Sequence, residues 1–333
     1  MMRMILTLTL LILTVGMIAS GCNDDQDGSG ATGDAKVVAT TTQVADIARN
    51  VAGERAEVAG LLAPNSDPHD HEPRPSDAEA AAGASLILTS GGDLDVWADE
   101  LVESSGTDAD VVALLDSVET IEADQERAHE EGEHEEDETE EEHPGEEVDP
   151  HWWQNPANAV LAVEEIRDRL SEIDPDGAAE YEANAAAYIE EIEAIDAGIG
   201  RCLGQVPADE RKLVTSHDAL GYFSDRYEIE PVGAAIPALT TQAQPSAGET
   251  AELVELIKVE SVNAVFPEAG LNADLEQAIA DEAGASVGGE LYADTLGEEG
   301  TPGETYLGAL AANARALAEG FSGGAVTCED LPS

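Results

Sequence analysis

The amino-acid sequence predicts an α/β protein of two lobes, each with a mostly parallel sheet flanked by helices, joined by a long backbone helix. Three observations support this fold class. Short β-rich runs alternate with helical patterns in both halves of the chain, which is typical of crossover units in a parallel sheet. One long helical stretch separates the halves, and a length of 333 residues is sufficient for two domains.

The expected N-terminal lobe covers residues 36–155. The run KVVATT opens it as a strand, and a helical pattern follows as far as Val51. A short helix begins at Pro75, a position at which a helix needs no backbone donor. The strands of this lobe are expected at 36–41, 56–62, 85–90 and 109–116, with a further helix at 93–105.

An acidic tract at residues 122–147 interrupts this lobe. It carries His129, His134 and His143 among many glutamates. Because low hydrophobicity with dense like charge cannot offset the entropy lost on ordering, we expect a disordered loop. The loop either collects metal ions with its histidines around the binding site or is only a solvated insertion.

Residues 156–203 are expected to connect the lobes by helices, the first beginning near Pro156. A second helical stretch covers residues 174–203, and its large apolar side chains fall on one helix face. A helix of this length spans roughly 45 Å, so it would run along both lobes and fix their separation. The residues on that face are Tyr181, Tyr188, Ile192, Ile195 and Ile199.

The expected C-terminal lobe covers residues 204–322 and repeats the alternation of strands and helices, and a tail follows at 323–333. The two halves match in architecture, without a sequence repeat between them. Strands are expected at 212–216, 230–235, 262–268 and 285–291, and helices at 218–227, 246–260, 273–283 and 304–321.

The N-terminal residues predict export and a lipid anchor. Residues 1–21 combine Arg3 with a short apolar run and small residues, as a signal peptide does. The sequence ASGC ends at Cys22 and resembles the lipobox of lipoproteins, whose cysteine takes a lipid; otherwise Cys22 is incidental in a soluble secreted protein. Residues 22–35 read as a flexible tether. We therefore expect a chain anchored on the extracytoplasmic face of the cell membrane.

The charge of the chain limits its partners. The formal net charge is -58, which argues against binding to nucleic acid or to anionic lipid, since phosphates would be repelled. Such an acidic balance is typical of adaptation to high salt, where screening removes the self-repulsion. Two further cysteines, Cys202 and Cys328, either close a disulfide outside the cell or remain buried free thiols.

Four residues with metal-binding side chains stand at the ends of expected strands or at the crossing between lobes. His69, His217 and Asp294 each follow a strand, and ligands of open α/β sheets bind beyond the carboxyl ends of strands. His151 stands in DPHWWQNP beside two tryptophans. Three imidazoles and one carboxylate match a tetrahedral zinc shell in type and number.

Each of these residues also has an ordinary interpretation. His69 and its neighbour His71 could be polar loop residues, His217 a helix cap and Asp294 a turn residue. We expect His69 rather than His71 to be the ligand, because two rings would compete for one space. The adjacent residues Trp152 and Trp153 are expected to pack, and their indoles can shield a metal from water.

The motifs around these residues resemble the substrate-binding lipoproteins of zinc and manganese ABC importers. The resemblance covers nearly the whole chain after the tether, and it implies that a metal is held between two lobes by His69, His151, His217 and Asp294. It also implies a cognate permease in the membrane and a monomeric binding protein. The motifs are PNxDPHxxEPxPSD, DPHxWxxP, TSHDAxGYF, QPSAxxxxELVxxIK, VFPE and LYADTLG.

The resemblance favours zinc, because His217 stands where manganese members tend to carry a carboxylate and imidazole is the softer ligand. Zn²⁺ is thus the expected metal, and Mn²⁺ the alternative; a metal-linked adhesin on the same fold also stays open, as does support of the site by His71 or Glu268. An enzyme is not expected. A secreted zinc hydrolase would need two histidines on one helix face, and His129 and His134 are five apart beside a glycine.

Overall fold

The computed structural model describes residues 35–122 and 148–331. The expected signal peptide, the lipidation at Cys22, the tether as far as residue 34 and the acidic tract from residue 123 lie outside the described residues. In the described part of the chain, none of the helices has the length and apolar character that crossing a bilayer requires.

The N-terminal lobe contains one four-stranded sheet whose strands all run parallel, in the order β2-β1-β3-β4. This order confirms the crossover topology expected from the alternation of strands and helices. The strands are β1 (Lys36–Ala39), β2 (Glu57–Gly60), β3 (Leu86–Thr89) and β4 (Asp110–Ala113), and the helices are α1 (Thr42–Ala52), α2 (Pro75–Ala82) and α3 (Trp97–Ser105).

Both faces of this sheet are buried, because successive side chains of a strand point to opposite faces. Val37 and Leu86 belong to the main core cluster together with Ile47 of α1. Their neighbours in the strands, Val38 and Ile87, belong to a second cluster with residues of α2 and α3. Continuous apolar runs such as LILT therefore fit strands covered by helices on both sides.

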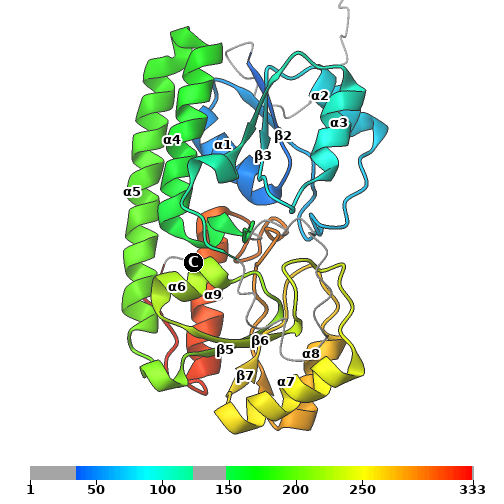
Figure 1. The fold of residues 1–333 in the computed structure, drawn as a ribbon. Helices are drawn as coiled ribbons and strands as arrows, with labels where there is room; N and C mark the ends of the chain where they lie inside the picture. Colours follow the sequence, from blue (N-terminus) through cyan, green and yellow to red (C-terminus); the bar gives the residue numbers. More distant parts are fainter. Residues whose placement is uncertain (1–34, 123–147, 332–333) are drawn as a thin grey trace, which may run out of the picture. The chain divides into compact units, whose positions relative to one another are not determined.

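Two helices connect the lobes, α4 (Pro156–Ile173) and α5 (Ala178–Leu203), and they lie side by side in Figure 1. The expected long helix begins four residues later than predicted, after a short 3-10 turn, η4 (Pro175–Gly177). Asp174 holds this turn, since its carboxylate accepts hydrogen bonds from Arg55 and Tyr181. All five side chains predicted to share one face of α5 are buried.

Helix α5 packs against elements of both lobes, as its length predicts. It contacts α1 in the N-terminal lobe and α9 (Tyr306–Phe321) in the C-terminal lobe. Its 26 residues span about 39 Å. One rigid element therefore fixes the positions of structures that lie far apart in the sequence.

The C-terminal lobe contains two parallel strand pairs, β5-β6 and β7-β8. A parallel bridge between Thr215 and Phe266 links the pairs, so the spatial order β6-β5-β7-β8 repeats the order of the N-terminal sheet. The strands are β5 (Lys212–His217), β6 (Glu230–Ile236), β7 (Ala264–Val265) and β8 (Ser286–Val287), and the helices are α6 (Gly221–Tyr227), α7 (Ala247–Glu260) and α8 (Asp274–Ala283).

Two strands of this lobe are shorter than the sequence predicts. The expected strands at 262–268 and 285–291 each contribute only two residues to a ladder. Beyond β8 the backbone of Gly288 approaches the ring of Phe266 so closely that a Cβ at residue 288 would collide with it. Glycine at this position thus permits a close approach, and its N–H donates a hydrogen bond of 2.8 Å to the carbonyl oxygen of Val265.

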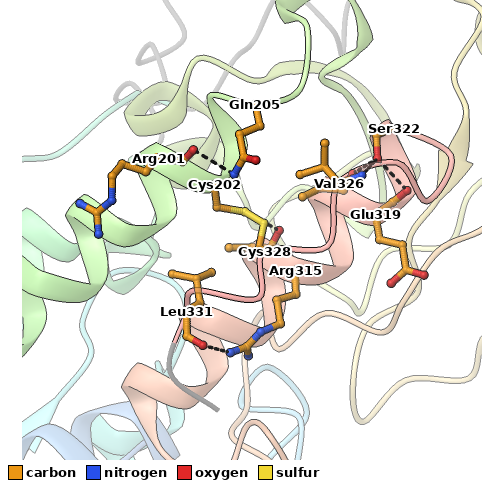
Figure 2. The surroundings of a disulfide bond; sticks show 11 residues. Arg201, Cys202, Gln205, Arg315, Glu319, Ser322, Val326, Cys328 and Leu331 are labelled. Carbon is orange, nitrogen blue, oxygen red and sulfur yellow. Dashed lines mark hydrogen bonds between the residues drawn. A yellow bond between two sulfur atoms is a disulfide. The ribbon is translucent and has the colours of Figure 1, made fainter.

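A disulfide joins Cys202, near the end of α5, to Cys328 in the segment after α9, with the two Cα atoms 5.3 Å apart (Figure 2). Nearby, Arg315 of α9 donates a hydrogen bond of 2.6 Å to the carbonyl oxygen of Leu331. Both Cys328 and Leu331 are buried. The C-terminal segment is therefore attached covalently to the helix that connects the lobes.

Candidate metal centre

The structure brings together His69, His151, His217 and Asp294, which are separated by up to 225 residues in the chain. Each offers one ligand atom, and these four atoms all lie within 4.8 Å of one another. His69 lies in the connection between β2 and α2, and His151 directly precedes the short 3-10 helix η3 (Trp152–Gln154). His217 is the last residue of β5, and Asp294 lies beyond β8. All four are buried, with exposed fractions of 0 to 8%.

The donor atoms of these side chains face a common point. Asp294 Oδ2 lies 3.2 Å from His69 Nε2 and 3.0 Å from His217 Nε2, and Asp294 Oδ1 lies 3.5 Å from His151 Nε2. None of these five atoms has a hydrogen bond of normal geometry with the described residues. Buried polar atoms without partners are costly, and a cation at this point would satisfy all of them together.

Two of the three imidazoles are oriented by carboxylates. His151 Nδ1 lies 2.7 Å from Asp149 Oδ1, and His217 Nδ1 lies 2.7 Å from Glu268 Oε2. Each carboxylate also accepts a hydrogen bond of 2.9 Å from the backbone N–H of its own histidine partner. Such contacts fix the tautomer that carries its proton on Nδ1, which leaves Nε2 free as a metal ligand.

Glu268 therefore supports the cluster, whereas His71 does not reach it. The ring of His71 lies against Trp97, with ring centroids 4.5 Å apart, and His71 Nε2 lies 3.5 Å from Asp77 Oδ2. The preference for His69 over His71 thus agrees with the positions of the two rings. The bonds of Glu268 had no separate signal in the sequence beyond its place after β7.

The carboxylates in and around the cluster shift the pKa values of its side chains in the direction that favours a positive charge at this point. Burial lowers the pKa of His217, but the carboxylates of Glu268 and Asp294 outweigh burial and raise this pKa well above its ordinary value. Burial also lowers the pKa of His151, and Asp294 and Asp149 raise it overall. Burial raises the pKa of Asp294, but the imidazoles of His217 and His151 hold this pKa well below its usual range. When the imidazoles are neutral, a bound divalent ion would supply the positive charge that compensates these carboxylates.

The segment that carries Asp294 is held in place by its backbone. The carbonyl oxygen of Ala293 accepts hydrogen bonds from Trp153 Nε1 at 2.9 Å, Gln154 Nε2 at 2.8 Å and Gln43 Nε2 at 3.3 Å. Trp153 also lies edge-on to His151, with centroids 5.5 Å apart. The tryptophans pack as expected, and the bonds of Trp153 and Gln154 add a positioning role that sequence reasoning missed.

Residues 37–320 match the protein family described as ZnuA, the periplasmic component A of the zinc-uptake complex. The chain belongs to this family. The match spans most of the sequence, including all four clustered residues, and it confirms the resemblance that the motifs indicated.

Proteins that are similar to this chain are named for different metals. The manganese-binding lipoprotein MntA of Halalkalibacterium halodurans is 30% identical over 313 residues, which cover 94% of this chain and 97% of MntA. The iron-binding protein YfeA of Yersinia pestis is 31% identical over 286 residues, 86% of each chain.

Among solved structures, the periplasmic zinc-binding protein TroA from Treponema pallidum superposes with a TM-score of 0.75 at 26% identity, covering 86% of this chain and 99% of TroA. This likeness confirms the two-lobe α/β fold with its long connecting helix. Together with membership of the ZnuA family, it confirms the prediction that the chain is an extracytoplasmic metal-binding component of an ABC importer.

Proposed function

We propose that this ZnuA-family protein captures Zn²⁺ with His69, His151, His217 and Asp294 and delivers it to its cognate permease. The observation that carries the proposal is the convergence of three imidazole Nε2 atoms and one carboxylate at a buried point. Imidazole nitrogen suits zinc, and four protein ligands complete its tetrahedral shell. A shell completed in this way has no open position for catalysis, so it suits capture and release.

The donor set also defines the alternative. Manganese is a harder ion that prefers oxygen ligands, and the relatives named for manganese make it the second candidate. Both oxygens of Asp294 face the cluster, so a larger shell with a bidentate carboxylate is compatible with the same side chains. Three nitrogens against one carboxylate nevertheless favour zinc.

The cellular setting follows from the same relatives. Several of them are named lipoproteins, which supports attachment of this chain through a lipid at Cys22 to the extracytoplasmic face of the membrane. We further propose that it acts as a monomer with one ion per chain. A Cys22→Ser variant should appear in the soluble fraction of cells, whereas retention in the membrane fraction would contradict the anchor.

A competition between the two metals tests the proposed specificity. Purified, metal-free protein is titrated with manganese in the presence and absence of zinc, in buffers of high and low salt, and bound metal is counted. We expect one zinc per chain and displacement of manganese by zinc at equal concentration. Manganese that resists displacement by zinc would overturn the assignment to zinc.

A further inference from the structure

We infer that Thr241 and Gln242 are positioning residues that hold the His69 loop, residues 65–71, over the metal and thereby set the rate at which the ion leaves. The inference rests on the proposed role of His69 as a ligand. It concerns a segment of the C-terminal lobe, residues 237–242, which lies between β6 and α7 and which we term the latch segment.

The buried position of the cluster requires that some ligand-bearing segment move before an ion can leave. His151 and His217 are fully buried, and carboxylates hold their Nδ1 atoms. The Asp294 segment is held by three donors to the carbonyl oxygen of Ala293. These three ligands are therefore the fixed part of the site.

His69 is held differently from the other ligands. Among the described residues, no carboxylate binds its Nδ1, in contrast to the other two imidazoles. Its loop is exposed at Asn65 and at Asp70, on either side of the buried ring. Since exposed loop backbone opens at lower free energy than buried strands, the His69 loop is the segment that releases the ion.

The latch segment holds the backbone of His69 directly at its carbonyl oxygen and, through Asp67, at its N–H. Thr241 Oγ1 donates a hydrogen bond of 2.6 Å to Asp67 Oδ2, and Asp67 Oδ1 accepts one of 2.9 Å from the N–H of His69. Gln242 Nε2 donates to the carbonyl oxygen of His69. Loss of either donor would leave the loop free to lift with its ring.

The latch segment is itself anchored beside another ligand. In the register of β5 and β6, His217 pairs with Ile236, and the N–H of Asp218 donates a hydrogen bond of 3.1 Å to the carbonyl oxygen of Ala238. Residues 237–242 thus run from the end of β6, which pairs with His217, to the loop that carries His69. A change at one ligand can pass to the other through this segment.

A small cavity marks the place where the latch closes. It is lined by Asp67, Thr241, Glu268 and Asp294 among other residues, so it reaches from the latch to a ligand and to the carboxylate behind His217. Opening the bond between Thr241 and Asp67 would widen this cavity next to Asp294. The acidic lining suits the passage of a cation.

The test is the rate of zinc release from the loaded full-length protein, followed by stopped-flow mixing with an excess of a fluorescent chelator. Thr241→Val keeps the shape but removes the donor, and we expect zinc to dissociate about tenfold faster. Gln242→Met should accelerate release about threefold, because a neutral hydrogen bond contributes less. Association rates should change little, since none of the four ligand side chains is altered.

Matched variants separate the latch from general effects on folding. Thr241→Ser retains the hydroxyl and should release zinc at nearly the unsubstituted rate. Thr250→Val on α7 and Gln277→Met on α8 make the same chemical changes outside the site, where each side chain donates to a residue four positions away. Thermal unfolding of the metal-free variants should match these controls, because the latch acts on the loaded site.

Release at the unsubstituted rate in both Thr241→Val and Gln242→Met would overturn the latch while leaving the proposed function intact. Faster release in Thr250→Val as well would also overturn it, since the effect would then not be specific to the segment. Failure of the unsubstituted protein to bind zinc would instead overturn the proposed function, and the latch with it.

Discussion

The tripeptide Asp-Pro-His occurs twice in this site, as residues 67–69 and as residues 149–151, and the two copies hold their histidines in different ways. In both, the aspartate accepts a hydrogen bond of 2.9 Å from the backbone N–H of the histidine two residues later. Asp149 also binds Nδ1 of its own His151. Asp67 instead turns its second oxygen to Thr241 in the other lobe.

This difference shows how one local motif can serve two purposes. In the copy at residues 149–151, Asp149 binds both the backbone N–H and Nδ1 of His151. The orientation of His151 therefore depends on a residue of the same tripeptide. The copy at residues 67–69 depends on a distant segment, so the orientation of His69 depends on contact between the lobes. One ligand is therefore held within its own lobe, and the other through a contact with the opposite lobe.

The largest expected effect on zinc affinity comes from removing His151, the ligand that is held within its own lobe. Four ligands share a zinc binding free energy of about 10–16 kcal/mol in structural sites, so His151→Ala should cost about 3–4 kcal/mol, or roughly a hundredfold to a thousandfold in affinity. Competitive titration against a chelator measures this loss. Equal zinc affinity in His151→Ala and in the unsubstituted protein would show that this tripeptide carries no ligand.

A smaller effect is expected when only the orientation of His151 is weakened. Asp149→Asn removes the charge behind Nδ1 but leaves an amide oxygen that can still accept its proton. We expect an affinity loss of about tenfold, at the lower end of the effect of such partners. Glu268→Gln, which makes the same change behind His217, is the matched variant, and titration of both should give similar losses. A normal affinity in both would contradict the orienting role.

The corresponding change in the other tripeptide should be smaller still and should appear in kinetics. His69 and Thr241 donate to different oxygens of Asp67, and Asp67→Asn replaces one of these acceptors by an NH2 donor, so we expect zinc release to be about threefold faster. Stopped-flow mixing with a chelator measures this rate. If Asp67→Asn instead reproduced the equilibrium loss of Asp149→Asn without a change in release, the contrast between the tripeptides would be wrong.

The smallest effect is expected from an aspartate that serves the fold alone. The hydrogen bond from Arg55 holds the pKa of Asp174 at about 2, against the opposing effect of burial. Asp174→Asn should leave zinc affinity unchanged and lower the unfolding midpoint by about 1–3 °C, as expected for a partly exposed ion pair.

The pH dependence of this last variant has a definite sign. A carboxyl with a depressed pKa stabilises the folded state above its unfolded pKa of about 3.9 and loses that contribution as pH falls through its folded value. The difference in midpoint between Asp174→Asn and the unsubstituted protein should therefore shrink between about pH 4 and pH 2. Thermal scans across this range test it, and a constant difference would assign the stabilisation to something other than the charge of Asp174.

The sequence was sufficient for the order of the elements and for the place of the cluster. Apolar runs locate the strands, although β7 and β8 are shorter than their runs predict, and parallel topology places His217 beside Asp294 at one edge. The start of α5 was predicted too early, because helical periodicity cannot reveal that Asp174 is bound to Arg55 more than a hundred residues away.

The partners of the ligands could be predicted less well. Asp149 stands two residues from His151 and was visible in the motif, but Asp67 has the same spacing and a different partner. Only the fold shows that Thr241 reaches it. Contacts of this kind depend on how loops from two lobes meet, which neither periodicity nor composition encodes.

The central claim is that His69, His151, His217 and Asp294 together hold one zinc ion. Diffraction from crystals of zinc-loaded protein, recorded on both sides of the zinc absorption edge, tests it most directly. We predict one strong anomalous peak, about 2.0–2.2 Å from the three Nε2 atoms and from a carboxylate oxygen of Asp294. An anomalous peak at any other place in the protein, with these four side chains left without metal, would contradict the claim.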